Sequence, residues 1–482
     1  MPNWIRPNIL LSACSSLLLA GCVSYHPQPI SPEKAAAEFE SRTLLDLGLK
    51  TYLEKNTGHE ITPWPPESWN AQTLTLAAFY YNPDLDLARA KAGIARAGVI
   101  TAGERPNPTL SFSPGRNTTS SGASPWIITS ALDIPIETAN KRGYRLARAR
   151  HDAQSAQANI LSTAWDIRAR LLRTMLDHVS STRSVEILKR QQSSQEEIVR
   201  LLELQLRQPN ANITAQQVTQ ARITLRGTRL AVLEAERQRV EAQAHLAQAV
   251  GIPLAALRDI PVTFDLSTDL PPTIAPDEAR RQALLTRADI LGALADYEAS
   301  QSALQLEIAK QYPDINLGPG YEYDQGDNKW SLGLSLTLPI LNQNRGAIAE
   351  AQAKRAEAAI HFTSLQAQVI GEIDTALSNY STARRRLQTT QELQSDIDKQ
   401  RKAAQSLFDA GEISRMELIG LQLELQTSEQ ASLDATVKAH QAIIDVEGAL
   451  QRPLDVPQAA LLDNPRRQPL PDQPSSHGAN LK

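Results

Sequence analysis

Large apolar and small or polar residues alternate strictly along one stretch of the chain. From Trp330 to Ile340 every even position is large and apolar, whereas the odd positions hold Ser, Gly, Thr or Pro. Because side chains along a strand point to alternate faces, this pattern predicts a strand with one apolar face. Its 11 residues (330–340) suffice for a tilted strand to cross a bilayer, which takes about 9–11. The expected membrane-facing residues are Trp330, Leu332, Leu334, Leu336 and Leu338.

The preceding segment repeats the alternation more weakly. Ile315, Leu317, Tyr321 and Tyr323 share one face, and residues 324–328, Asp-Gln-Gly-Asp-Asn, predict a hairpin loop. A hairpin of a soluble β-sandwich, with one face packed on a core, fits this window equally well, because barrel strands are weak signals singly.

The hairpin segment occurs twice. Pro108-Thr-Leu-Ser-Phe-Ser-Pro-Gly115 returns as Pro313-Asp-Ile-Asn-Leu-Gly-Pro-Gly320, at an offset of 205 (313 − 108). Trp126 and the run from Leu132 to Ile136 return at Trp330 and from Leu336 to Ile340, at an offset of 204 (330 − 126). So long a period indicates a duplicated half-domain rather than a solenoid.

Very long helices are predicted to follow each hairpin. No proline occurs between Pro135 and Pro209 or between Pro339 and Pro453, and good helix formers dominate both stretches. Apolar residues from Leu146 to Leu171 recur at the coiled-coil spacing of three and four. One helix over 141–207 would be about 100 Å long. A filamentous coiled coil is the alternative, but it would not need two bilayer-length hairpins.

Turns are expected at 208–212 and 409–412, followed by return helices at about 213–250 and 413–450. The resulting organisation has six parts. They are a signal peptide (1–21), an N-terminal strap (22–70), a first repeat (71–255), a linker (256–275), a second repeat (276–453) and a C-terminal tail (454–482).

The N-terminus reads as a secretion signal. Arg6 precedes a short apolar stretch that ends in Leu19-Ala20-Gly21-Cys22. This ending resembles the bacterial lipobox, in which the cysteine is lipidated and becomes the first residue of the mature protein. Cys22 is therefore the expected lipid-bearing residue, and Val23 after it implies sorting to the outer membrane.

Composition and motifs give little support for other chemistry. The chain has 49 basic and 53 acidic residues, a net charge of −4, which does not suggest nucleic acid binding. The eight histidines include no pair at ligand spacing, and no catalytic or phosphate-binding motif occurs. We expect no enzyme activity, no metal site and no cofactor besides the lipid on Cys22.

Two hairpins supply four strands, which are too few to close a barrel. An open sheet edge in lipid leaves backbone groups unpaired at several kcal/mol each. Several copies must therefore pool their strands, and two would give eight strands, three twelve. Twelve strands leave room for a bore, so a trimer is preferred.

The sequence resembles the TolC-type outer-membrane efflux family over roughly residues 70–455. The resemblance rests on Asn82-Pro-Asp-Leu85, Arg105-Pro-Asn-Pro108, the Leu-x-Leu-Pro-Ile hairpin end and the turn Ala410-Gly-Glu-Ile-Ser414. It implies a mainly helical homotrimer with a twelve-stranded β-barrel in the outer membrane and a helical tunnel in the periplasm. It also implies a periplasmic adaptor and an inner-membrane pump, commonly of the RND class. The segment from Asp133 to Gly143 is similar to the heavy-metal branch, with Ala139-Asn140 where that branch usually has Gly-Gly.

The resemblance also suggests where the pore closes. Glu417 matches the first of two acids that the family carries early in the return helix, whereas Gly420 stands where the second would be. Three converging Glu417 side chains should raise one another's pKa. Asp396 and Asp398 are further gate candidates. The expected adaptor contacts are Gln208, Asn210, Asn212, Asp409, Gly411, Glu412 and Ser414.

The function expected from these observations is a passive exit duct of a tripartite efflux system for small solutes, heavy-metal cations or drugs among them. A type I secretion duct is the alternative within transport. A periplasmic coiled-coil scaffold or adaptor lipoprotein is the alternative from another class.

Overall fold

The computed structural model describes residues 25–119, 124–208 and 213–454. The chain divides into two compact units, Met1–Arg42 and Thr43–Lys482. In the described part of the first unit, helix α2 (Pro32–Glu40) begins at Ser31, whose side chain accepts a hydrogen bond from the Lys34 amide. The predicted signal peptide, Cys22, the turn residues Asn210 and Asn212, and the tail from 455 onward lie outside the described residues.

The second unit contains two very long helices, as the sequence predicts. They are α6 (Lys141–Leu206) and α10 (Arg345–Asp409), with 66 and 65 residues. The return helices are α7 (Ala215–Val250) and α11 (Arg415–Leu450). Shorter helices are α3 (Leu47–Thr57), α4 (Ala71–Tyr81), α5 (Pro83–Gly103), the 3-10 turn η1 (Leu254–Leu257), α8 (Pro276–Thr286) and α9 (Ala288–Ala309). Within the described ranges no helix combines the length and apolar character that a membrane span needs.

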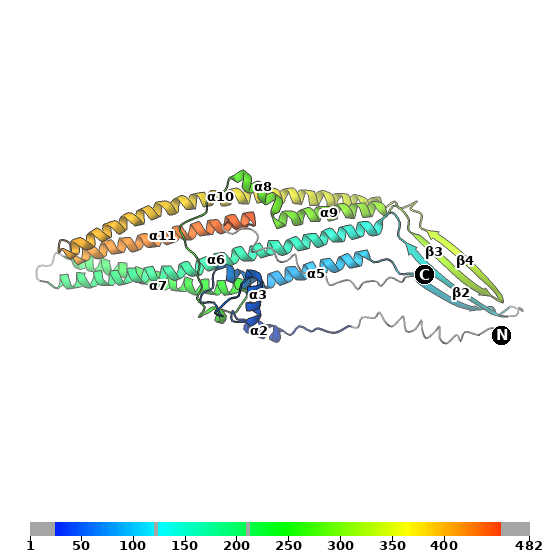
Figure 1. Ribbon diagram of the computed structural model, residues 1–482, viewed down its shortest axis with the longest axis horizontal. Coiled ribbons are helices and arrows are strands. Elements are labelled where there is room, and N and C mark those ends of the chain that lie inside the picture. Colours follow the sequence, from blue (N-terminus) through cyan, green and yellow to red (C-terminus); the bar gives the residue numbers. More distant parts are fainter. Residues whose placement is uncertain (1–24, 120–123, 209–212, 455–482) are drawn as a thin grey trace. The chain divides into compact units, whose positions relative to one another are not determined.

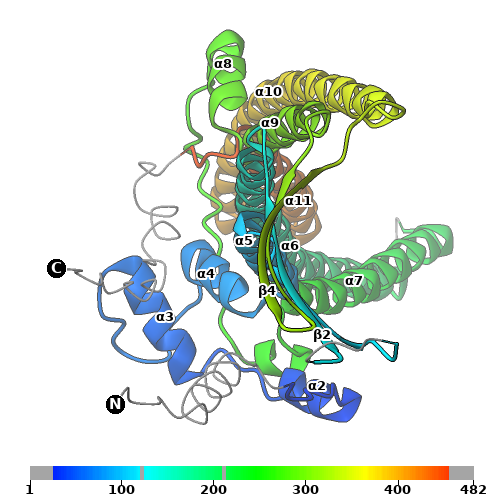
Figure 2. The ribbon, with the colours of Figure 1, turned by 90° about the vertical axis from the view of Figure 1, so that its right-hand side faces the viewer.

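These helices form a single layer. Helix α6 packs against α5 and α7 on one side and against α9 and α11 on the other, and α10 packs against α9 and α11 (Figure 1). The order across the layer is therefore α5 or α7, then α6, then α9 or α11, then α10. Helices α3, α4 and α8 all lie on one side of this layer (Figure 2).

A buried cluster fixes α3 and α4 to the layer. Leu49, Leu74, Leu171 and Leu246 are fully buried in it, from α3, α4, α6 and α7 respectively. The part of the predicted strap from residue 43 to residue 70 thus contributes to this core, beginning with Leu44. The predicted linker also packs here, since Val262 bridges to Trp69 in a parallel pair.

The strands form one antiparallel sheet in the order β1 (Thr109–Arg116), β2 (Trp126–Ile136), β3 (Ile315–Asp324) and β4 (Asp327–Leu336). Directly paired residues share a face. The pairs place one apolar face across all four strands, with Leu110, Leu132, Leu317 and Leu334 among its members. The other face carries mostly Ser, Thr, Gly, Asn and charged residues, with Ile127, Ala131 and Pro135 among them.

Two details of the second hairpin differ from the prediction. The loop has only two residues, Gln325 and Gly326, both with positive φ as the tightest hairpin turns require. Strand β4 starts at Asp327 and ends at Leu336, so Leu338 and Ile340 lie beyond it. The alternation was read correctly, but the strand end depends on a pairing partner and not on the pattern alone.

Leu334 tests whether the apolar face meets lipid. Leu334→Arg should strongly reduce membrane assembly, because an arginine facing lipid near the bilayer centre costs about 2–4 kcal/mol. Ser335→Arg, one residue on and on the opposite face, is the matched control and should assemble normally. The measurement is the yield of protein extracted from outer membranes as an SDS-resistant oligomer. Equal tolerance of both variants would show that this face does not contact lipid.

A strained turn joins β2 to α6. Ala139 and Asn140 both have positive φ, at 52° and 58°. Glycine adopts this conformation without penalty, asparagine with little, and alanine only at a cost. The turn is stabilised by Lys141, whose ammonium donates to the Tyr312 carbonyl and the Asp314 carboxylate, each at 2.7 Å. The Gly-Gly that the heavy-metal branch usually carries would suit this geometry.

Ala139→Gly should raise the free energy of unfolding by up to about 1 kcal/mol, because relief of the left-handed backbone outweighs glycine's entropy cost. Ala147→Gly, inside α6, is the control and should lower it by about 1 kcal/mol. Urea unfolding followed by circular dichroism measures both. Two changes of the same sign would contradict the strain at Ala139.

Candidate functional site: the hairpin tips and the face of the helical layer

Both return helices begin with the same hydrogen-bonded cap. At α11 the Ser414 hydroxyl accepts from the Glu417 amide (3.2 Å), and the Glu417 carboxylate accepts from the Ser414 amide (2.7 Å). At α7 the Thr214 hydroxyl and the Gln217 side chain make the equivalent pair, at 3.3 and 2.8 Å. Glu417 and Gln217 therefore make the same capping hydrogen bonds, but only Glu417 carries a charge. The Ser-x-x-Glu signature of this cap is visible in the sequence.

The local cap sets the acidity of Glu417 in the single chain. The hydrogen bond from the Ser414 amide, then that from its side chain, holds the pKa of Glu417 below its ordinary value. This direction is opposite to the raised pKa expected for three converging copies. The raised pKa stays a prediction about an assembly, in which repulsion would have to outweigh this cap.

The rest of the second tip is a compact turn. Gly411 has φ 77°, and the Glu412 amide donates to the Leu407 carbonyl (2.9 Å), which closes the end of α10. Asp409 accepts from Gln405 at 2.9 Å. At the first tip Gln208 is exposed, and its amide donates to the Gln205 carbonyl.

The other two gate candidates form ion pairs along their own helix. Asp396 binds Lys399 at 2.9 Å, and Asp398 binds Arg401 at 3.0 Å and Lys402 at 2.7 Å. The hydrogen bond from Lys402, then that from Arg401, lowers the pKa of Asp398. In the single chain each of these carboxylates is thus paired with a basic side chain of the same helix.

A stripe of carboxylates on α6 was not foreseen. Asp152, Asp166 and Asp177 are 14 and 11 residues apart, close to four and three helical turns, so they share one side of the helix. Leu171 and Met175, which pack in the cluster with α3 and α4, point roughly the other way. The stripe therefore faces away from α3, α4 and α8. Its spacing could have been found in the sequence.

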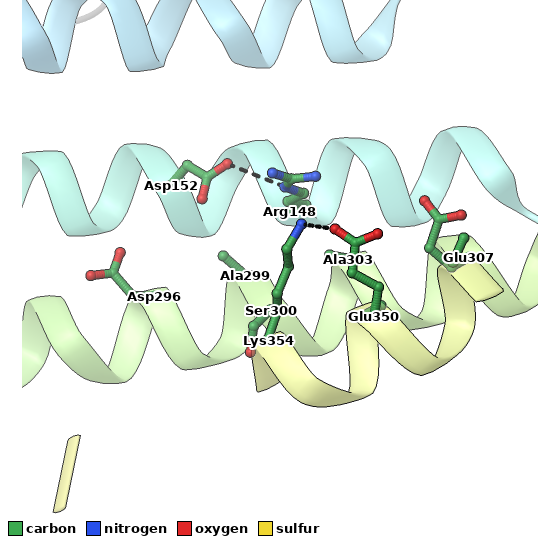
Figure 3. A pocket seen from close by; sticks show the side chains of 11 residues that line it. Arg148, Asp152, Asp296, Ala299, Ser300, Ala303, Glu307, Glu350 and Lys354 are labelled. Carbon is green, nitrogen blue, oxygen red and sulfur yellow. Dashed lines mark hydrogen bonds and ion pairs between the residues drawn. The ribbon is translucent and has the colours of Figure 1, made fainter. Parts of the chain in front are cut away.

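A groove of about 320 Å³ lies along this side, between α6, α9 and α10 (Figure 3). Arg148 and Asp152 line it from α6 and Asp296 from α9, while Glu350 and Lys354 pair within α10 at 2.6 Å. Burial raises the pKa of Asp152; Arg148 opposes this, whereas the facing Asp296 carboxylate adds to it.

A second groove, of about 820 Å³, lies where α9 begins and α11 ends. Burial raises the pKa of Asp166 there, with Arg170 opposing and Asp289 adding to the rise. Arg287 binds Asp289 at 2.6 Å and Glu372 at 3.0 Å. In the described parts of the chain no cluster of His, Cys, Asp and Glu has the geometry to hold a metal ion. The grooves are charged and open to water rather than shaped around one ligand.

The comparison with known families decides the identity of this architecture. A model of the family described as outer membrane efflux protein matches residues 77–252 and 279–450, most of the chain. The chain belongs to this family. Its outer-membrane location and its role in efflux follow, and the family decides against a periplasmic scaffold.

Individual relatives of this efflux protein are distant. The cobalt-zinc-cadmium resistance protein CzcC of Cupriavidus metallidurans is 23% identical over 407 residues, covering 83% of this chain and 95% of its own. The probable outer membrane lipoprotein SilC of Salmonella typhimurium is 22% identical over 451 residues, covering 89% and 95%. The CmeC outer membrane channel of Campylobacter jejuni has the same fold, with a TM-score of 0.65 and 16% identity, covering 92% of this chain and 96% of that one.

The two tip caps should respond differently to acid. Because the pKa of Glu417 is lowered in the folded chain, its contribution is present above the ordinary glutamate value of about 4.3 and is lost as pH falls through the lowered value. Gln217 does not titrate. Acid should therefore speed hydrogen exchange in the first turn of α11 but not of α7, after correction for intrinsic rates. Equal acid sensitivity of the two turns would contradict this role of Glu417.

Proposed function

We propose that three copies of this chain form a closed exit duct across the outer membrane. The observation that carries the proposal is the sheet, which has one continuous apolar face and two unpaired edges, β1 and β4. In lipid each unpaired backbone group costs several kcal/mol, and four strands cannot close on themselves. Three copies supply twelve strands, enough for a bore.

The helical layer has a matching free edge. On α7, the side chains of Ile223, Leu230, Leu233 and Val240 are 55–68% exposed at coiled-coil spacing. Of their counterparts on α11, 200 positions further on, Leu433 is only 7% exposed, and Gln430 accepts a hydrogen bond from Ser184 on α6. The α7 stripe would be covered in the same way by a neighbouring copy.

The duct would receive its cargo from a periplasmic adaptor and an inner-membrane pump of the RND class. The support is the family assignment together with the β2–α6 junction, which is similar to the heavy-metal branch. Lipid on Cys22 would add an anchor in the outer membrane. The tips would contact the adaptor through Gln208, Asn210 and Asn212 in one hairpin, and Asp409, Gly411, Glu412 and Ser414 in the other.

Heavy-metal cations are the first cargo class to test among small solutes. CzcC is named for cobalt, zinc and cadmium resistance, and the carboxylate stripe of Asp152, Asp166 and Asp177 faces the side of the layer that would become the interior. Carboxylates along a water-filled bore attract cations without binding them tightly. The duct would be passive, with the pump supplying the energy.

Glu417 is the proposed gate residue, with Asp396 and Asp398 as weaker candidates. Planar-bilayer conductance of the purified protein tests both the duct and the gate. Wild type should give discrete, cation-selective channels, and Glu417→Gln should lower the cation-to-anion permeability ratio severalfold. Glutamine keeps the cap, because Gln217 makes the same two hydrogen bonds. The variant thus removes charge without removing the fold of the tip.

Gln217→Glu is the converse variant and should raise the permeability ratio by placing a second acid at the other tip. Channels that ignore Glu417→Gln would keep the duct and place the gate elsewhere. A correctly folded oligomer that gives no channels, either as wild type or as Glu417→Gln, would overturn the duct.

A further inference from the structure

Strand β4 ends earlier than its counterpart in the first repeat. Strand β2 runs to Ile136, through Pro135, and β3 pairs with it to the end. The equivalent residues of the second repeat are Pro339 and Ile340, but β4 stops at Leu336. Beyond it Leu338 and Ile340 are 62% and 71% exposed. The Ile340 amide instead donates to the Leu338 carbonyl at 2.8 Å, in a local turn.

The duplication gives a template for the missing partner. The first strand of each hairpin repeats after 205 residues and the second after 204. Applied to the pair Leu110↔Leu132, these shifts give Ile315↔Leu336, which is the register that the structure shows. The two hairpins thus have the same register, so the same shifts relate equivalent residue pairs elsewhere in the sheet.

The same shifts applied to the β2–β3 interface define an interface between copies. The pair Ile134↔Leu317 becomes Leu338↔Phe112, and Ile136↔Ile315 becomes Ile340↔Leu110. We propose that residues 334–341 of one copy pair antiparallel with β1 of a neighbouring copy, with Leu338 opposite Phe112 and Ile340 opposite Leu110. Strand β4 lengthens by this pairing. The inference rests on the proposed self-association and adds its register.

The faces of the sheet provide an independent check. Leu110 and Phe112 are largely exposed on β1, on the same apolar face as Leu334 and Leu336 on β4. The inferred register brings these two exposed apolar rows together on one face. A slip by one residue would set Leu338 against Ser111 or Ser113, whose side chains belong to the opposite face.

Backbone chemistry also permits the longer strand. Pro135 lies inside β2 and pairs with Asn316, so a proline at the equivalent position 339 is no obstacle. Opening the local turn frees the Ile340 amide and the Leu338 carbonyl for the ladder. In the longer strand the backbone of the neighbouring copy replaces this local bond, so that both groups stay paired.

Disulfide trapping in full-length protein tests the register. Leu338→Cys with Phe112→Cys, and separately Ile340→Cys with Leu110→Cys, should give covalent dimers and trimers on a non-reducing gel after mild oxidation. Directly opposed residues of antiparallel strands have Cα atoms about 4.5–5.5 Å apart, which lies within the range of a disulfide. Two separate pairs keep the test valid if one variant fails to assemble. Each single-cysteine parent is the control and should stay uncrosslinked.

Two mismatched cysteine pairs test whether the register is correct. Leu338→Cys with Leu110→Cys, or with Pro114→Cys, should crosslink severalfold less than with Phe112→Cys. Stronger crosslinking of either mismatched pair would overturn the register. Native mass spectrometry of the same samples separates the two proposals, because a monomer would overturn the self-association. An intact oligomer with no crosslink in either matched pair would overturn only the pairing of β4 with β1.

Discussion

The need to pair every backbone amide and carbonyl in hydrocarbon governs the whole molecule. One chain satisfies it along three strand interfaces and leaves it unmet along the outer edges of β1 and β4. No side-chain substitution can pair the backbone groups of an open sheet edge in lipid, so further copies of the chain must pair them. The arrangement of the helices follows from the same requirement. Each hairpin is joined to a long helix by a short turn. A closed ring of strands would therefore continue as a ring of helices, and α7 has an exposed apolar stripe that a neighbouring copy would cover.

The two repeats share this architecture, but equivalent contacts in the two halves are made by different residues. Where α4 meets α5, the Asn82 side chain donates to the Ala249 carbonyl at 3.2 Å. At the equivalent place Arg287 donates to the Ala449 carbonyl at 2.7 Å and also binds Asp289 and Glu372. A neutral amide in one half thus corresponds to a buried cation in the other, and the two carboxylates compensate the cost of burying that charge. In both halves a carbonyl in the last turn of the return helix is therefore bound by the residue that precedes α5 or α9 of the same repeat.

The sequence predicted the elements well and the ends of elements less well, for physical reasons. Helix α6 and the apolar face of β4 follow from periodicity, which is local. The end of β4 does not, because Leu338 alternates correctly but lacks a partner strand in one chain. Glu417 was read as a gate from its place in the family, whereas its backbone partner Ser414 shows a cap as well. Ala139 was noted only as a departure from Gly-Gly, because a positive φ is not visible in the sequence.

The carboxylate stripe on α6 connects the fold to transport. Burial raises the pKa of Asp152, Asp166 and Asp177 even though each stays accessible to water. All three are partly desolvated, and Asp152 and Asp166 also face a second acid, so their ionised forms do not add stability at neutral pH. They are tolerated where the wall faces a water-filled space. In the proposed duct they would favour cations over anions, and their spacing of several helical turns would keep any one ion from meeting two levels at once. Such a surface passes charge along without holding it, which is what an exit duct requires.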